Sequence, residues 1–512
     1  MHLLSPPTNS EWLSFSLLLF GLTSFIVLAE GVRKALRWSP EVTRKLVHIS
    51  TGILIFFAPR IFVSGIPAIL LAVIFIVVNF AAIEFGLLKG MHGTNRRSYG
   101  TVYYPLSFLI LVLLCWDSMP QLISASILVL GLGDAAAAIV GENLRSPHNY
   151  ALTSDKKSLE GSFAMFATTF LIVVVVLETM SGLMMNAQLS RSLHLSHHVA
   201  SVLIAFAVSL FATAWEAISS KGLDNLAIPL STAFVLHYCL SPLPHHVPVQ
   251  FIAGVVLALV FAAISFSLRF LSASGSVATF ILAAIVFGSG GWQWTIPILA
   301  FFLLSSLLSK LGKKRKAAFQ LMFEKSDTRD AGQVAANGGA AGIIILFWYF
   351  FPGYPGWYAL YLASLAAVTA DTWGTEIGLL AKGSPRSITT LKKAETGTSG
   401  AVSIAGIAGG ALGALFIALS GSVWLAGDVL IRAFVLIVVS GIAGSLADSF
   451  LGATLQARYQ CDVCRKMTER TTHCDTPAQL AGGVRWVNND VVNWVCAIAG
   501  PFFFLLMFSV PM

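Results

Sequence analysis

Residues 120–141 read PQLISASILVLGLGDAAAAIVG, an apolar stretch in which Asp134 is the only charged residue. A transmembrane helix needs about 20 consecutive apolar residues, so the stretch predicts a helix that crosses a membrane. A carboxylate at membrane depth is costly and is usually paired, bound to a metal or placed beside a polar cavity. The stretch therefore predicts a class of protein and also a position for its chemistry.

The composition of the chain agrees with this class. Of its 512 residues 56% are hydrophobic and 11% are charged, whereas soluble proteins carry about a quarter charged residues. This excludes an ordinary soluble enzyme, a disordered chain and a nucleic-acid binder with a basic surface. We expect an all-α polytopic membrane protein with about 15–16 spans in two consecutive bundles. The candidate spans are 11–30, 46–63, 66–86, 102–116, 120–141, 162–180, 198–218, 227–240, 248–270, 276–290, 292–311, 334–352, 356–381, 400–421, 428–455 and 487–511.

The basic residues predict the orientation of these spans. With the N-terminus outside and alternating spans, the inner side receives all of the 32 Lys and Arg except Arg60, Arg191 and Arg432. Cytoplasmic loops carry such an excess, so we expect a multi-pass protein, of a bacterial inner membrane, with its active sites on the cytoplasmic face. The proline-rich segment SPLPHHVP at 241–248 divides the chain and predicts two domains, 1–245 and 246–512.

Two further helices combine small residues with acids. ADTWGTEIG at 370–378 contains Asp371 and Glu376, and GIAGSLADSFLG at 441–452 contains Asp448. Small residues let helices approach closely, so a packing seam with an incidental polar residue is one interpretation. Ala or Ser would pack as well without the cost of burying a carboxylate. The other interpretation makes Asp134, Asp371 and Asp448 ligands of Mg²⁺.

Polar loops follow the first two of these helices. One is KKSLEGS at 156–162, with Lys156, Lys157, Glu160 and Ser162, and the other is ETGTSG at 395–400, with Thr396 and Thr398. Turns rich in Gly, Ser and Thr offer backbone N–H groups and hydroxyls to a phosphate, and Lys supplies the compensating charge. The alternative is a solvated loop that obeys the positive-inside rule.

Other polar clusters fall on the same predicted side of the membrane. Their candidate site residues are Arg44, Lys45, Arg97, Glu216, Asp224 and Asn225 in the first half, and Lys316, Arg329, Asn489 and Asp490 in the second. Bases that hold phosphate oxygens and carboxylates that hold Mg²⁺ are what phosphoryl transfer needs. No P-loop or Rossmann fingerprint occurs in a strand–helix context. A nucleoside triphosphate from the cytoplasm and a lipid alcohol from the bilayer could meet here.

The first half, about residues 40–240, resembles the polyprenol/phytol kinase family, which includes dolichol kinase. The resemblance rests on Arg44-Lys45-x-x-His48, Gly133-Asp134, Lys157-Ser-x-Glu160-Gly-Ser162, Glu216 and Asp224-Asn225-x-x-x-Pro229. The second half, about residues 250–512, is similar to the phytyl-phosphate kinase family, long described as a transmembrane domain of unknown function. Its matching residues are Gly275-Ser-x-Ala278, Arg329 through Gln333, Ala370-Asp371 with Glu376, Thr396-x-Thr398-x-Gly400, Asp448 and Asn489-Asp490-x-x-Asn493.

The two resemblances imply two sequential kinases in one chain. The first would phosphorylate phytol or a related isoprenoid alcohol from CTP with Mg²⁺. The second would phosphorylate the monophosphate to the diphosphate, the donor for prenyl transfer to tocopherols or quinones. A lipid cytidylyltransferase and a transporter with parallel repeats remain alternatives.

Residue roles follow from that implied chemistry. Mg²⁺ would be held by Asp134 and Asp224, with Lys157 and Arg44 or Arg97 offsetting phosphate charge. Glu160 or Glu216 would accept the proton of the alcohol. In the second half the acids are Asp371, Glu376, Asp448 and Asp490, and the bases are Arg329 and Lys316.

Four thiol and imidazole side chains lie in the long predicted inner loop 456–485. They are Cys461, Cys464, His473 and Cys474. Cys-x-x-Cys followed by His-Cys supplies four ligands suited to a structural Zn²⁺, and a reducing cytoplasm does not favour a disulfide. Ordinary loop thiols are the alternative.

Overall fold

The computed structural model describes residues 2–86, 98–179, 188–241, 243, 247–311, 328–381, 383–425 and 430–509. These residues are mainly helical, and eleven of the described helices are long and apolar enough to cross a membrane. The chain divides into two compact units, Met1–Ile252 and Ala253–Met512. The predicted all-α membrane fold is therefore confirmed.

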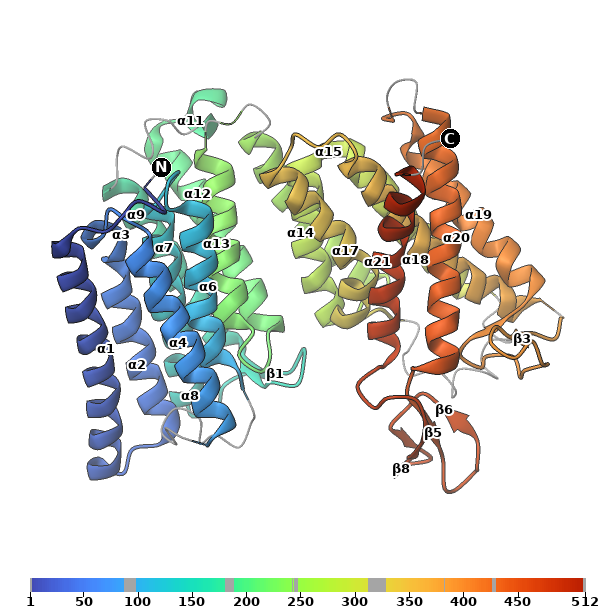
Figure 1. Cartoon of the computed structure of the whole chain (residues 1–512), viewed down its shortest axis with the longest axis horizontal. Coiled ribbons are helices and arrows are strands. Elements are labelled where there is room, and N and C mark those ends of the chain that lie inside the picture. Colours follow the sequence, from blue (N-terminus) through green and yellow to red (C-terminus); the bar gives the residue numbers. More distant parts are fainter. Residues whose placement is uncertain are drawn as a thin grey trace. The chain divides into compact units, whose positions relative to one another are not determined.

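Unit 1 is a bundle of helices with one small hairpin (Figure 1). Its elements are α1 (Asn9–Leu36), α2 (Pro40–Phe56), α3 (Ala58–Ile61), α4 (Ile66–Glu84), α6 (Gly100–Cys115), α7 (Gln121–Leu128), η1 (Val129–Asp134), α8 (Ala135–Asn143), β1 (Asn149–Tyr150), β2 (Lys157–Ser158), α9 (Leu159–Thr179), α11 (Gln188–Ser192), α12 (His197–Ile218) and α13 (Asp224–Leu240). The antiparallel pair β1–β2 lies at the end of this bundle away from α11 (Figure 1).

The stretch 120–141 forms a helix with a wider turn in its middle. The segment Val129–Asp134 is a π-helix between α7 and α8, and π turns inside helices often occur at functional sites. Glycines on this turn allow close packing. A Cβ at Gly131 would lie 3.4 Å from the Cα of Gly52 in α2, and one at Gly133 would lie 2.8 Å from the Met165 sulfur in α9. The last residue of the turn, Asp134, is thus held by two neighbouring helices.

Unit 2 is a second helical bundle with short strands at one end (Figure 1). Its helices are α15 (Ala273–Lys310), α17 (Ala331–Phe350), α18 (Trp357–Leu380), α19 (Ile404–Ser422), α20 (Leu430–Thr454) and α21 (Asn489–Phe508), and α14 (Pro248–Ser267) leads into it from unit 1. The strands are β3 (Arg386–Ser387), β4 (Ala401–Val402), β5 (Arg458–Gln460), β6 (Met467–Thr468), β7 (Thr472–His473), β8 (Thr476–Pro477) and β9 (Gln479–Gly482).

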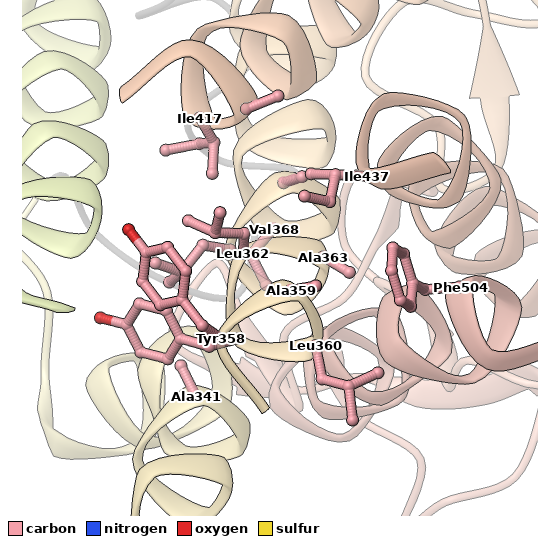
Figure 2. Close-up of a cluster of buried hydrophobic side chains, with 14 of the residues drawn as sticks. Ala341, Tyr358, Ala359, Leu360, Leu362, Ala363, Val368, Ile417, Ile437 and Phe504 are labelled. Atoms are coloured by element: carbon pink, nitrogen blue, oxygen red, sulfur yellow. The ribbon is translucent and has the colours of Figure 1, made fainter. Parts of the chain in front are cut away.

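Helix α18 forms the centre of unit 2. Its apolar side chains pack against residues of five other helices. These include Trp294 of α15 and, as Figure 2 shows, Ala341 of α17, Ile417 of α19, Ile437 of α20 and Phe504 of α21. Residues 358–370 of α18 are all buried, as expected for a helix surrounded by protein. The acids that follow on α18 are therefore fixed to the most enclosed helix of the unit.

Glycines let α18 and α19 approach with their backbones almost in contact. A Cβ at Gly374 would lie 3.1 Å from the carbonyl oxygen of Gly406, and one at Gly410 would lie 2.9 Å from the carbonyl oxygen of Ala370. This close approach of small residues is typical of helix pairs in membranes.

We expect Gly410→Val to destabilise unit 2 by about 1–3 kcal/mol, because the added side chain must push apart two backbones that cannot yield locally. Thermal unfolding of the purified protein in detergent should show a lower Tm. Gly353→Ala is a matched control, since a Cβ at Gly353 has nothing within 4 Å. Equal Tm values for the two variants would contradict this packing.

The predicted 15–16 spans exceed the eleven helices for identifiable reasons. The segments 276–290 and 292–311 belong to one element, α15, which is broken at Gly291 with φ 62° and ψ −156°. Helices α2, α6 and α13 have only 17, 16 and 17 residues, fewer than the roughly 20 of a full span. Helix α18 also lies outside the eleven, and it carries Asp371 and Glu376.

Candidate functional site

Unit 1 contains a cavity of about 1220 Å³. One part of its wall is apolar and comes from α2, α4 and α6, with Ile55, Leu71, Phe75 and Phe108. The other part is charged and lies where α2, the π turn, β2, α12 and α13 meet. Its predicted site residues are Arg44, Lys45, Asp134, Lys156, Lys157, Glu216, Asp224 and Asn225. A cavity with one apolar and one highly polar wall suits an amphipathic ligand.

Lys157 lies at the centre of the charged wall. Its Nζ is 2.7 Å from Glu216 Oε1 and 3.9 Å from Asp224 Oδ2, and the Glu216 side chain is only 4% exposed. Burial alone would lower the pKa of the Lys157 ammonium, but the carboxylates around it raise that pKa above its ordinary value. A buried carboxylate needs such a partner, so Lys157 stays charged and fixes Glu216 within the cavity wall.

Ser162 adds a hydroxyl to this cluster. Its Oγ donates to Glu216 Oε2 at 3.2 Å and lies 2.6 Å from the Tyr150 hydroxyl. Because Tyr150 belongs to β1 and Lys157 to β2, the hairpin supplies both of these side chains to the hydrogen-bond network around Glu216.

Two carboxylates share one region of the cavity. Asp134 acts electrostatically on both Asp224 and Lys157, and the Asn225 amide donates to Asp224 Oδ1 at 3.3 Å. The other amide atom, Asn225 Oδ1, is buried and has no hydrogen-bond partner among the described residues. Buried polar atoms normally have partners, and carboxylate and amide oxygens are the ligands that Mg²⁺ prefers. The donor set of Asp134, Asp224 and Asn225 therefore fits a magnesium ion.

The basic residues of α2 have different surroundings. Lys45 forms an ion pair with Glu142 of α8. Arg44 lines the cavity and acts electrostatically on Asp224, so it is available to a phosphate entering the charged region. The other predicted bases, Arg97 and Lys316, lie outside the described residues.

Glu160 does not share the position of Glu216. Its Oε1 lies 2.6 Å from His148 Nδ1, and its carboxylate also accepts from the His148 backbone N–H. Glu216 lines the cavity, whereas Glu160 is not among the described residues that do so. The structure thus separates the two carboxylates that the sequence offered as proton acceptors.

Sequence reasoning left three cavity residues without a role. His48 and Tyr104 pack edge to face with ring centroids 4.7 Å apart, and His48 Nε2 is buried without a hydrogen-bond partner in the described part of the chain. Asp155 accepts from the Lys221 backbone N–H at 3.1 Å. The position of Asp155 directly before Lys156-Lys157 could have marked it in the sequence as a site residue. Tyr104 lies in an apolar run, which gives no such indication.

In unit 2 the structure brings two predicted acids together. The carboxyl groups of Asp371 on α18 and Asp448 on α20 lie near each other and interact. Cys496 of α21 lies close to both of them. Two ionised carboxylates this close repel each other, and a proton or a cation between them removes the repulsion.

A second charge pair lies in the same unit. Arg329, just before α17, interacts electrostatically with Glu376 of α18, and burial lowers the pKa of its guanidinium to about 10. The guanidinium remains charged at neutral pH and lies over the rings of Phe301 and Phe302, 5.3 and 5.5 Å from their centroids. This is a partly buried cation that interacts with one acid and two aromatic faces.

The remaining predicted residues of unit 2 lie on a turn and at a helix start. Thr396 and Thr398 belong to a turn in which the Thr398 N–H donates to the Glu395 carbonyl at 3.2 Å. Asn489 and Asp490 lie in the first turn of α21, which the preceding Asn488 caps by accepting from the Val491 N–H at 3.1 Å. Helix α21 packs against α18 and α20.

The four predicted zinc ligands also come together. One ligand atom from each of Cys461, Cys464, His473 and Cys474 lies within 4.8 Å of the others. Hydrogen bonds from the backbone N–H of Cys464 and of Val463 lower the pKa of the Cys461 thiol to about 6, although the surrounding protein opposes this shift. The thiolate, which is the metal-binding form, is thereby favoured.

Comparison with known proteins gives relatives for much of the chain. The family described as "Integral membrane protein DUF92" matches residues 256–501. Protein PGR of Arabidopsis thaliana is 30% identical over 49% of this chain and 94% of its own length. A protein named phytol kinase, from Synechocystis, is 28% identical over 45% of this chain and 93% of its own length.

A further relative, the chloroplastic protein VTE6 of Arabidopsis thaliana, is 27% identical over 46% of this chain and 65% of its own length. No solved structure matches the chain. The matched segment, the near-complete coverage of Protein PGR and the apolar helices agree: the chain belongs to the integral membrane protein DUF92 family.

Proposed function

We propose that this protein is a membrane-bound isoprenoid kinase with two active sites. The unit 1 cavity would transfer phosphate from CTP to phytol or a related prenol, and unit 2 would phosphorylate the monophosphate to the diphosphate. The observation that carries the proposal is a cavity that is lined both by Lys157, Glu216, Asp134 and Asp224 and by apolar side chains. Relatives named phytol kinase support the reaction class.

In the first step the apolar wall would hold the prenyl chain and direct its hydroxyl to the charged wall. The alcohol oxygen attacks the γ-phosphorus of CTP, the bond from that phosphorus to the β–γ bridging oxygen breaks, and CDP leaves. Glu216 accepts the proton of the alcohol, and Lys157 and Arg44 offset the charge of the transferred group. A Mg²⁺ held by Asp134, Asp224 and Asn225 would supply charge neutralisation on the nucleotide phosphates.

In the second step the acceptor is already a phosphate, so positioning and charge neutralisation matter more than a general base. Asp371 and Asp448 would bind Mg²⁺, and Arg329 would face the phosphates. The turn with Thr396 and Thr398 offers hydroxyls and N–H groups to the same phosphates. On the predicted topology both sites belong to the cytoplasmic face of a bacterial inner membrane, and the product would serve prenyl transfer in tocopherol or quinone synthesis.

The released nucleotide distinguishes this proposal from its rivals. Purified protein in detergent and in the presence of Mg²⁺ should convert phytol and CTP to phosphorylated lipid and CDP. A lipid cytidylyltransferase would release pyrophosphate instead, and a transporter would release neither product. Chromatography of the released products separates CDP from pyrophosphate. Pyrophosphate without CDP would overturn the kinase assignment.

The two candidate proton acceptors are expected to behave differently. Glu216→Gln should lower prenol phosphorylation by about 10²–10⁴-fold, because the amide keeps the shape of the side chain but cannot take the proton. Glu160→Gln should keep most of the activity, since its carboxylate is bound to His148 outside the cavity wall. Steady-state rates with phytol test the pair, and a larger loss for Glu160→Gln would contradict the assignment.

A further inference from the structure

The Cys and His side chains of unit 2 lie on two neighbouring hairpins. Cys461 and Cys464 occupy the turn between β5 and β6, and His473 and Cys474 lie at the turn between β7 and β8. The first turn is closed by hydrogen bonds from Arg465 N to the Cys461 carbonyl (2.9 Å) and from Cys461 N to the Lys466 carbonyl (3.1 Å). Each hairpin thus presents two ligand atoms to a common point.

The distances from the His473 nitrogen to two of the sulfurs are close to those of a tetrahedral metal centre. His473 Nδ1 lies 3.5 Å from Cys464 Sγ and 3.2 Å from Cys474 Sγ. Zinc bonds of about 2.3 Å to sulfur and about 2.0–2.1 Å to nitrogen place tetrahedral S and N ligands about 3.5 Å apart. Three sulfurs and one imidazole nitrogen form a closed ligand set, which is typical of structural rather than catalytic zinc.

The hairpins are built from short strands, although β5 also pairs with β9 in a three-stranded sheet. Strands β5 to β8 contain three, two, two and two residues, and hairpins this short are marginal without further support. Arg465, Cys474 and Asp475 all have positive φ, at 59°, 52° and 57°, so these turns also hold residues in a conformation that L side chains rarely adopt. A metal that binds only the folded arrangement would stabilise these turns further.

One residue of these hairpins reaches the acidic pair of unit 2. Glu469 directly follows β6, and its carboxylate accepts a hydrogen bond from the Ser399 hydroxyl. The charge of Glu469 also acts on Asp448. Glu469 therefore connects the hairpins both to the 395–400 turn and to the α18–α20 acids.

The 395–400 turn itself lies against the end of α20. A Cβ at Gly400 would be 2.5 Å from the Ser449 carbonyl oxygen, and one at Gly452 would be 3.1 Å from the Gly400 nitrogen. Gly400 has φ +75°, which favours glycine at this contact. The turn is held between the helix that carries Asp448 and the carboxylate of Glu469.

We propose that Cys461, Cys464, His473 and Cys474 bind one structural Zn²⁺, which holds Glu469 against Ser399 and so fixes the 395–400 turn beside Asp448. The zinc site is independent of the proposed kinase function. Only the use of the fixed turn to bind phosphate rests on that function. Glu469 is then a positioning residue that acts through Ser399.

Metal analysis of the purified full chain tests the first half of this proposal. Wild type, a Cys239→Ala control and His473→Cys, which keeps four ligands, should each contain about one zinc per chain, whereas Cys464→Ser should contain far less. Cys239 is buried in unit 1 and far from the cluster in sequence. Wild-type protein without zinc, or Cys464→Ser with full zinc, would overturn the site.

Hydrogen exchange tests the coupling to the turn without any activity assay. Cys464→Ser, or wild type treated with a chelator, should lose amide protection in both 456–487 and 395–402. Glu469→Ala should keep zinc and the protection of 456–487 but lose protection in 395–402, and Glu469→Gln, whose amide oxygen can still accept from the Ser399 hydroxyl, should restore part of it. Unchanged protection of 395–402 after zinc removal would overturn the coupling, whatever the kinase assays show.

Discussion

Asp134→Asn is expected to lower prenol phosphorylation by about 10²–10³-fold, the size of effect seen when one preorganised electrostatic group is removed from an active site. The substitution keeps the side-chain volume on the π turn but removes the charge that Asp134 contributes beside Asp224. Phosphorylation of added phytyl monophosphate to the diphosphate should continue, because that step is assigned to unit 2. Separate assays with phytol and with phytyl monophosphate measure the two effects.

Asp117→Asn is the matched control for this substitution. Asp117 also belongs to unit 1, but its carboxylate accepts from the His2 and Leu3 backbone N–H groups and does not line the cavity. The Asp117→Asn protein should phosphorylate phytol at close to the wild-type rate. If Asp134→Asn phosphorylated phytol as fast as this control, the assignment of a magnesium site to Asp134 in unit 1 would be wrong.

Asp371→Asn is expected to produce the opposite pattern. Phytyl monophosphate should accumulate, and its conversion to the diphosphate should fall by about 10²–10³-fold, since Asp371 and Asp448 would hold one cation between them. The first phosphorylation should stay close to wild type. Thin-layer chromatography of the lipid products over time measures both steps in one reaction.

Thr372→Ser offers a control on the neighbouring position of α18. The Thr372 hydroxyl donates to the Val368 carbonyl at 2.8 Å, and serine can keep that bond. The Thr372→Ser protein should form diphosphate at nearly the wild-type rate. If Asp371→Asn instead abolished the first step, or left the second untouched, the division of labour between the units would be wrong.

The sequence predicts the membrane fold well because the decisive signal is local. A run such as 120–141 shows its apolar character directly, and the small residues around Asp371 and Asp448 predict close helix packing, which the glycine contacts of α18 and α19 confirm. Helix lengths are predicted less well. The break at Gly291 and the short α2, α6 and α13 depend on packing that apolar runs do not specify.

For the same reason, the sequence does not predict the partners of individual side chains. Lys157 and Glu160 lie three residues apart, yet Lys157 reaches Glu216 on α12 while Glu160 turns to His148. The contact of Ser399 with Glu469 likewise joins segments separated by 70 residues. Such pairings follow from the way helices and hairpins assemble, which no local motif records.

The most direct test of a two-step isoprenoid kinase follows the label of the nucleotide. Purified wild-type protein is incubated with phytol, Mg²⁺ and CTP labelled at the γ position, and in parallel at the α position, and the lipids are separated. The γ label should enter the monophosphate first and then the diphosphate, and the α label should stay in CDP. Appearance of the α label in lipid, or of no label in lipid at all, would contradict the proposed function.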